Sequence, residues 1–161
     1  MTKHVHDPIS PGPMLAQLAF LEGDFEGEGK YADGSGTFRK CSAGRSEVGG
    51  RFLGLRMQAS YPLPDGSLDR HSALVMVGES GDSGTLTAHV YTDGGAMHHY
   101  HVELSAGQVV FADALPDHGA QWKRARKILV PTDYGFEERL EVAGDQGDFV
   151  PFYRIAMHRV P

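Results

Sequence analysis

Apolar and polar side chains alternate with a period of two along most of the chain. In residues 52–61, apolar residues occupy every odd position from Leu53 to Tyr61, whereas Arg56 and Gln58 lie on the other face. Residues 86–91 and 149–158 show the same alternation. Successive side chains of a β-strand point to opposite faces, so this pattern predicts strands with one buried face.

Glycine-rich turn signals separate these segments at short intervals. The signals are DGSG (33–36), VGG (48–50), PLPDGS (62–67), ESGDSG (79–84), DGG (93–95), SAG (105–107), PTDYG (131–135) and GDQGD (144–148). Such spacing predicts about ten antiparallel strands joined by hairpin turns. Because no repeat or change of composition interrupts the pattern, we expect one domain over residues 1–161, with residues 1–12 as a flexible leading segment.

One segment, residues 13–21, has helical rather than strand periodicity. Met14, Leu15, Leu18 and Leu21 recur at helical spacing, but the segment is too short to be stable alone. A meander of ten strands usually closes on itself, since closure removes its two unpaired edges. We therefore predict an all-β, ten-stranded antiparallel up-and-down β-barrel of lipocalin (calycin) type, with a short N-terminal helix plugging one end.

The stretch GDFEGEG, residues 23–29, follows the predicted helix. Its glycines, Gly23, Gly27 and Gly29, leave Phe25 as the large residue of the segment. Glycine inside a strand permits close approach of another element or sharp coiling at a barrel seam. We expect Phe25 to pack on the plug helix.

This stretch resembles the opening of the nitrobindin-like proteins and of a related bacterial family in the lipocalin-like (calycin) group. These proteins begin with a short helix and a Gly-x-Trp-x-Gly-x-Gly signature, and Phe25 stands at the tryptophan position. The segments VGGRFL (48–53) and 125–160 are also similar to the family. The resemblance implies a ten-stranded barrel with an internal pocket.

The resemblance also bears on haem. The nitrobindin branch binds haem through a histidine of the last strand and carries nitric-oxide or peroxynitrite chemistry. Laying FYRIAMHRV on that strand puts Phe152 at the ligand position, and phenylalanine cannot ligate iron. His158 lies about 20 Å further along the strand, at the barrel rim. We predict no cofactor, with haem held by another histidine as the alternative.

The stretch AMHHYHVE, residues 96–103, holds three histidines in four positions. The strand period divides them between two faces. His98 and Tyr100 share the more apolar face, which we expect to line the barrel. His99 and His101 share the other, which is typical of a solvated strand face.

A metal site is the alternative for the second face. His99 and His101 would be two imidazole ligands, and Glu103 or His89 would be the third. The remaining spacing does not match known patterns of this kind, so we predict no metal.

Few residues are marked for chemistry. The candidates for ligand binding are His89, Tyr91, His98, Tyr100, Arg154 and His158. His89 and Tyr91 line the barrel only if its interior carries a polar wall, and the pattern leaves this open. No nucleophile elbow, phosphate loop, dinucleotide fingerprint or His-Glu-x-x-His motif occurs, so no catalytic residue is predicted. Glu137, Glu138 and Glu141 are interpreted as a charged hairpin.

Charge and composition exclude several classes of partner. The net charge of −6 disfavours nucleic acid, and the basic run WKRARK (122–127) is interpreted as the charged outer face of a strand. No apolar run is long enough to span a membrane. A single cysteine and the lack of a signal peptide suggest the cytoplasm. The family also allows a homodimer, although no interface pattern is visible.

The sequence therefore favours binding of a small, largely apolar ligand inside the barrel. Two alternatives remain. One is the haem protein described above. The other is an enzyme that uses the pocket, with a His–Tyr or His–Arg pair as acid–base groups.

Overall fold

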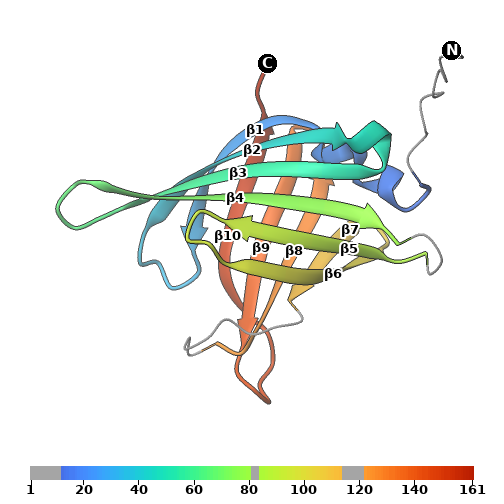
Figure 1. Cartoon of the computed structure of the whole chain (residues 1–161). Coiled ribbons are helices and arrows are strands. Elements are labelled where there is room, and N and C mark those ends of the chain that lie inside the picture. Colours follow the sequence, from blue (N-terminus) through green and yellow to red (C-terminus); the bar gives the residue numbers. More distant parts are fainter. Residues whose placement is uncertain (1–11, 81–83, 114–121) are drawn as a thin grey trace, which may run out of the picture.

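The computed structural model describes residues 12–80, 84–113 and 122–161, which form a closed barrel of ten antiparallel strands (Figure 1). Each strand pairs with its sequence neighbours, and the first pairs with the last. The strands are β1 (Gly23–Tyr31), β2 (Thr37–Glu47), β3 (Phe52–Pro62), β4 (Leu68–Glu79), β5 (Leu86–Thr92), β6 (Met97–Ser105), β7 (Gln108–Asp113), β8 (Arg124–Thr132), β9 (Gly135–Ala143) and β10 (Val150–Arg159). The predicted fold class is confirmed.

All eight predicted turn signals fall at junctions between consecutive strands, although residues 81–83 of ESGDSG lie outside the described part of the chain. The connection between β7 and β8 is the exception, since it carries no recognised signal and residues 114–121 lie outside the described part. The leading segment 1–12 also lies outside it, apart from Gly12. Within the described ranges, no helix has the length and apolar character needed to cross a membrane.

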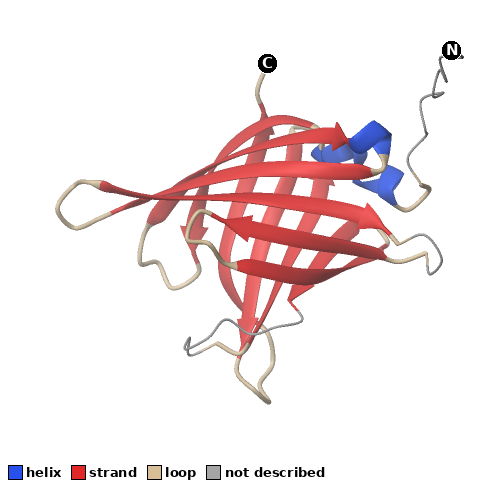
Figure 2. Cartoon of the chain, viewed as in Figure 1, coloured by secondary structure: helices blue, strands red, loops and turns tan. Residues whose placement is uncertain are grey.

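A short helix closes one end of the barrel (Figure 2). This helix, η1 (Leu15–Leu21), is a 3₁₀-helix that contacts β3, β4 and β9. Its buried residues are Leu15, Leu18 and Leu21. Because a 3₁₀-helix has three residues per turn, a spacing of three places all of them on one face. A second 3₁₀ turn, η2 (Val48–Gly50), joins β2 to β3.

Glycines on the inner face let the helix and an aromatic ring approach the wall. A Cβ on Gly44 of β2 would lie 1.9 Å from the carbonyl oxygen of Leu21, and one on Gly29 would lie 2.3 Å from the ring of Phe38. Phe25 reaches the helix through another ring. Its centroid lies 5.0 Å from that of Phe136, which in turn lies 6.2 Å from that of Phe20 on η1.

Buried side chains alternate along the strands and identify the inner face of each. On β5, Leu86, Ala88 and Val90 are buried, and on β10, Ile155 and Met157 are buried. The core begins against η1 and continues toward the opposite end. There β1, β3, β5, β7 and β9 end, and β2, β4, β6, β8 and β10 begin.

Candidate functional site

The barrel encloses a cavity of about 360 Å³. Most of its wall is apolar, with Leu55 and Val75 on one side and Leu129 and Phe136 on the other. A second cavity, of about 350 Å³, is lined by Phe38, Lys40, Tyr61, His98 and others. Met57, Lys127 and Tyr153 line both spaces, so the two cavities are neighbours within the barrel.

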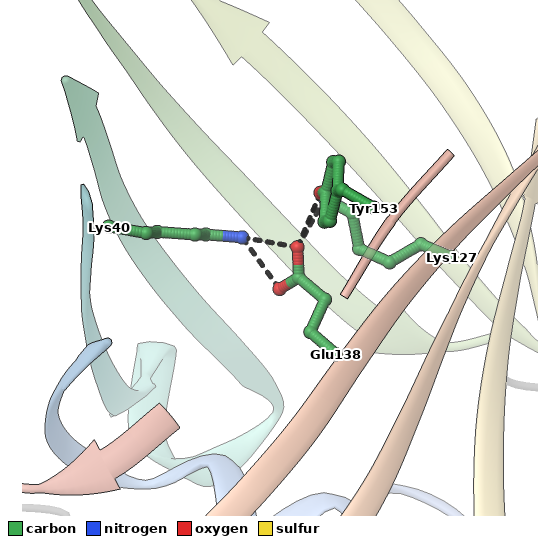
Figure 3. Close-up of polar contacts among 4 residues, drawn as sticks. All are labelled: Lys40, Lys127, Glu138 and Tyr153. Carbon is green, nitrogen blue, oxygen red and sulfur yellow. Dashed lines mark hydrogen bonds and ion pairs between the residues drawn. The ribbon is translucent and has the colours of Figure 1, made fainter. Parts of the chain in front are cut away.

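An ionic cluster of four residues, which we call the interior cluster, lies between the cavities: Lys40 (β2), Lys127 (β8), Glu138 (β9) and Tyr153 (β10). Lys40 Nζ donates to both carboxylate oxygens of Glu138, at 2.7 and 2.6 Å. The Tyr153 hydroxyl donates to Glu138 Oε1 at 2.6 Å. Figure 3 shows Lys40 and Tyr153 converging on this carboxylate. Lys127 Nζ lies further away, 3.8 Å from Glu138 Oε1.

The surroundings of the interior cluster shift its titration. Burial alone would raise the pKa of Glu138, but Lys127 and Lys40 outweigh it, together with hydrogen bonds from Lys40 and Tyr153, and hold the pKa at about 2. Burial lowers the pKa of Lys40 to about 8, against the attraction of Glu138. Burial and the neighbouring Glu138 raise the pKa of Tyr153 well above its usual value. At neutral pH the Lys40 ammonium, the Glu138 carboxylate and a protonated Tyr153 phenol therefore lie together in the cluster.

Isolated charges are very costly inside a protein, and a buried pair is tolerated when it is well hydrogen-bonded. Glu138 meets this condition, because its two oxygens accept three hydrogen bonds. Tyr153 can still accept a hydrogen bond through its hydroxyl oxygen. The interior cluster thus presents a fixed set of charges and dipoles to whatever enters the cavities.

The sequence interpretation of Glu138 as part of a charged hairpin is wrong. Glu138 faces inward and is 2% exposed. The sequence already indicated that Glu138 faces the interior, because the strand period puts it on the same face as Phe136, Leu140 and Val142. Only Glu137 and Glu141, on the outer face of β9, fit the interpretation as a charged hairpin. Glu137 pairs with Arg154 and Arg139, and Glu141 pairs with Arg126.

The basic run WKRARK also divides between two faces. Arg124 and Arg126 lie on the outer face of β8, where both guanidinium groups stack on the ring of Phe149, although Arg124 also lines part of the first cavity. Lys127 faces inward and lines both cavities. The prediction of a wholly outer charged face is therefore corrected for Lys127, because the strand period turns every second residue of β8 into the barrel.

The predicted division of AMHHYHVE is confirmed in its geometry. On β6, Val102 is buried, and His98 and Tyr100 share its inner face. His98 lines the second cavity and Tyr100 lines the first. Their role in binding stays a prediction.

His99 and His101 lie on the outer face of β6. The ring of His99 lies 4.8 Å from that of His89 and 5.5 Å from that of His101, measured between centroids. Among the described residues, no group of three or more His, Cys, Asp or Glu side chains is arranged to hold a metal ion. The metal-site alternative is therefore not supported.

The other four candidates, His89, Tyr91, Arg154 and His158, do not lie on the inner face of the barrel, and their role in binding stays a prediction. His89 and Tyr91 oppose the buried residues of β5, so both are exposed. Arg154 is exposed and pairs with Glu137. His158 is exposed near the helix end, where it stacks on Tyr134 with ring centroids 4.6 Å apart. The apolar residues of β5 and β10 occupy the inner faces of these strands, so the side chains of the four candidates do not point into the barrel.

The last strand offers no histidine to a haem inside the barrel. Its inner face carries Tyr153, Ile155 and Met157. Phe152, at the position that the resemblance gives to the haem ligand, is 37% exposed beside a register shift in β10, although it lines part of the first cavity. The residues present therefore do not fit a haem ligated from β10.

A closed ten-stranded barrel in which neighbouring strands of the sequence pair is an up-and-down β-barrel, and this one encloses a cavity. The fold is similar to that in the crystal structure of Rv2717c from M. tuberculosis, with a TM-score of 0.63 over 94% of this chain and 100% of that chain. The two sequences are 14% identical, so the likeness shows the fold alone. No family model and no curated protein sequence matches the chain.

Proposed function

We propose that this protein binds a small, largely apolar molecule in the barrel interior. The proposal is carried by the first cavity, whose size of about 360 Å³ lies within the range of ligand sites in proteins. Such sites are mainly apolar with a few fixed polar groups, and here the interior cluster supplies those groups. The apolar wall would provide most of the affinity, and the cluster would orient the ligand.

Titration with N-phenyl-1-naphthylamine tests the proposal. This neutral aromatic amine fluoresces more strongly in apolar surroundings. We expect saturable binding of one molecule per chain. Leu55→Trp, which fills the cavity from β3, should weaken binding by about tenfold or more, equivalent to about 1.4 kcal/mol. Val90→Phe fills the same cavity from β5 and gives a second variant should the first fail to fold.

A matched control uses the same substitution on the surface. Leu68, at the start of β4, is 52% exposed and lines none of the cavities described. Leu68→Trp should therefore leave the dissociation constant unchanged. Thermal unfolding of each variant shows whether the barrel is intact. If the probe does not bind the wild type, or if folded cavity-filled variants bind it as well as Leu68→Trp does, the barrel interior is not its site and the proposal fails.

A further inference from the structure

We infer that the ligand is an amphipathic anion, with an apolar tail in the first cavity and a carboxylate held by Lys127. This inference rests on the proposed function, since it names the chemical class that the same interior would select. It is carried by the charges along the cavity and by the geometry of Lys127 relative to the interior cluster.

The charges around the first cavity run opposite to the charge of the whole molecule. The chain has 21 acidic and 15 basic residues, giving a net charge of −6. Among the described residues that line the cavity, three are basic, Lys123, Arg124 and Lys127, and one is acidic, Glu138. A cavity wall of this composition attracts an anion that the rest of the surface repels.

Glu138 is already saturated by its other partners. Lys40 and Tyr153 donate three hydrogen bonds to its oxygens. Lys127 Nζ remains 3.8 Å from Oε1, too far for a hydrogen bond. Within the described part of the chain, the Lys127 ammonium donates no hydrogen bond. The side chain is 28% exposed and lines both cavities, so its three donors are accessible from the interior.

The charges of the interior cluster determine which head group of the ligand is favoured. Lys40 and Glu138 neutralise one another, which leaves Lys127 as the surplus charge of the interior cluster. A neutral ligand that displaced water from Lys127 would leave this ammonium poorly solvated, and a cationic ligand would be repelled by it. A carboxylate would supply the missing acceptor, in surroundings where the low dielectric strengthens the attraction.

The start of β8 places further positive charge beside the cavity. Lys123 and Arg124 line it and precede Lys127 along the same segment. The Arg124 guanidinium is held by the carbonyl oxygens of Gly144 and Gly147 and by the ring of Phe149. This anchored charge would favour the approach of an anion, while Lys127 is the group that contacts the head.

Decanoate and 1-decanol provide a matched pair of probes, because they have the same number of carbon atoms and differ in their head groups. Each is titrated against the full chain by isothermal calorimetry and by displacement of N-phenyl-1-naphthylamine at neutral pH. We expect decanoate to bind at least about tenfold more tightly than decanol, the usual value of a hydrogen bond to a charged group.

Variants of Lys127 separate its charge from its packing. Lys127→Met keeps an apolar stem and should remove the preference for decanoate without weakening decanol or N-phenyl-1-naphthylamine. Lys127→Arg should retain the preference. Lys30→Met is the matched control, since Lys30 is an exposed lysine on the outer face of β1, and this variant should behave as the wild type.

The outcomes distinguish this inference from the proposed function. Equal binding of decanoate and decanol to the wild type, or a preference for decanoate that survives in Lys127→Met, overturns the assignment of Lys127 and the anionic class. If the neutral amine still binds, the proposal that the interior binds an apolar molecule stands. Failure of the neutral amine to bind the wild type overturns the proposed function, and the inference falls with it.

Discussion

At the scale of single residues, the interior cluster is unusual because it places an ion pair where an apolar core would suffice. Replacing a buried pair with apolar residues is often neutral or stabilising, whereas removing one partner is costly. Lys40 and Glu138 are 6% and 2% exposed, so each depends on the other for its charge. Stability alone therefore does not explain the pair. The pair is accounted for if, as we propose, the cluster orients a bound molecule.

The low pKa of Glu138 makes the free energy of unfolding depend on pH. Its pKa is about 2 in the folded protein, against 4.5 ordinarily, so the unfolded chain binds the proton more tightly. The stability that this carboxylate contributes is present above pH 4.5 and is lost as the pH falls toward 2. A difference of this size is worth about 3 kcal/mol. Urea unfolding at a series of pH values from 6 to 2.5 measures it.

The control for this prediction is the double variant Lys40→Met, Glu138→Leu. It keeps every other carboxylate and removes the interior pair, so its stability should fall less steeply between pH 4.5 and 2.5. Parallel curves for the wild type and the double variant would show that Glu138 does not titrate with a lowered pKa in the folded state.

At the scale of strands and turns, local signals located every strand junction except the one between β7 and β8. The eight turn signals and the period of two located the strands, because hairpins are determined by a few residues each. The sequence identifies the inner face of a strand where one of its two faces is clearly apolar. On β5, the face of Leu86, Ala88 and Val90 is buried, and the candidates His89 and Tyr91 lie opposite.

The interior cluster could not be predicted in the same way. Lys40 shares its face on β2 with Phe38 and Ser42, and this face is barely more apolar than the other. Lys40 and Glu138 lie 98 positions apart, and only closure of the barrel brings them together. No local pattern contains that information. The strand period marks Glu138 as an exception on an apolar face, but it does not identify the partner.

Packing of the plug helix depends on a glycine in β2. A Cβ on Gly44 would lie 1.9 Å from the Leu21 carbonyl oxygen, which is backbone and cannot turn aside. Gly44→Ala should therefore destabilise the protein by about 1–3 kcal/mol, the usual cost of overpacking. Gly144→Ala is the control, because nothing lies within 4 Å of its added methyl group and its backbone is not in the left-handed region. Urea unfolding compares the two, and equal midpoints would mean that η1 does not press on β2.

At the scale of the whole molecule, closure links the fold to the site. The barrel has no free strand edge, because β1 pairs with β10 from Phe25↔Arg159 to Tyr31↔Tyr153. The interior cluster combines β2, on one side of this seam, with β8, β9 and β10 on the other. The same closure that removes the edges thus assembles the groups that we propose to contact the ligand.

Loss of the last strand should therefore abolish both the fold and binding. A chain that ends at Phe149 lacks β10, so β1 and β9 each become an unpaired edge, and Tyr153, Ile155 and Met157 leave the interior. We expect this chain to aggregate, to lose cooperative thermal unfolding in circular dichroism and to bind no N-phenyl-1-naphthylamine. Removal of Pro161 alone is the control, because it lies beyond β10 and is exposed, and it should leave all three properties intact. A monomeric, cooperatively unfolding chain without residues 150–161 would contradict the dependence of the interior on barrel closure.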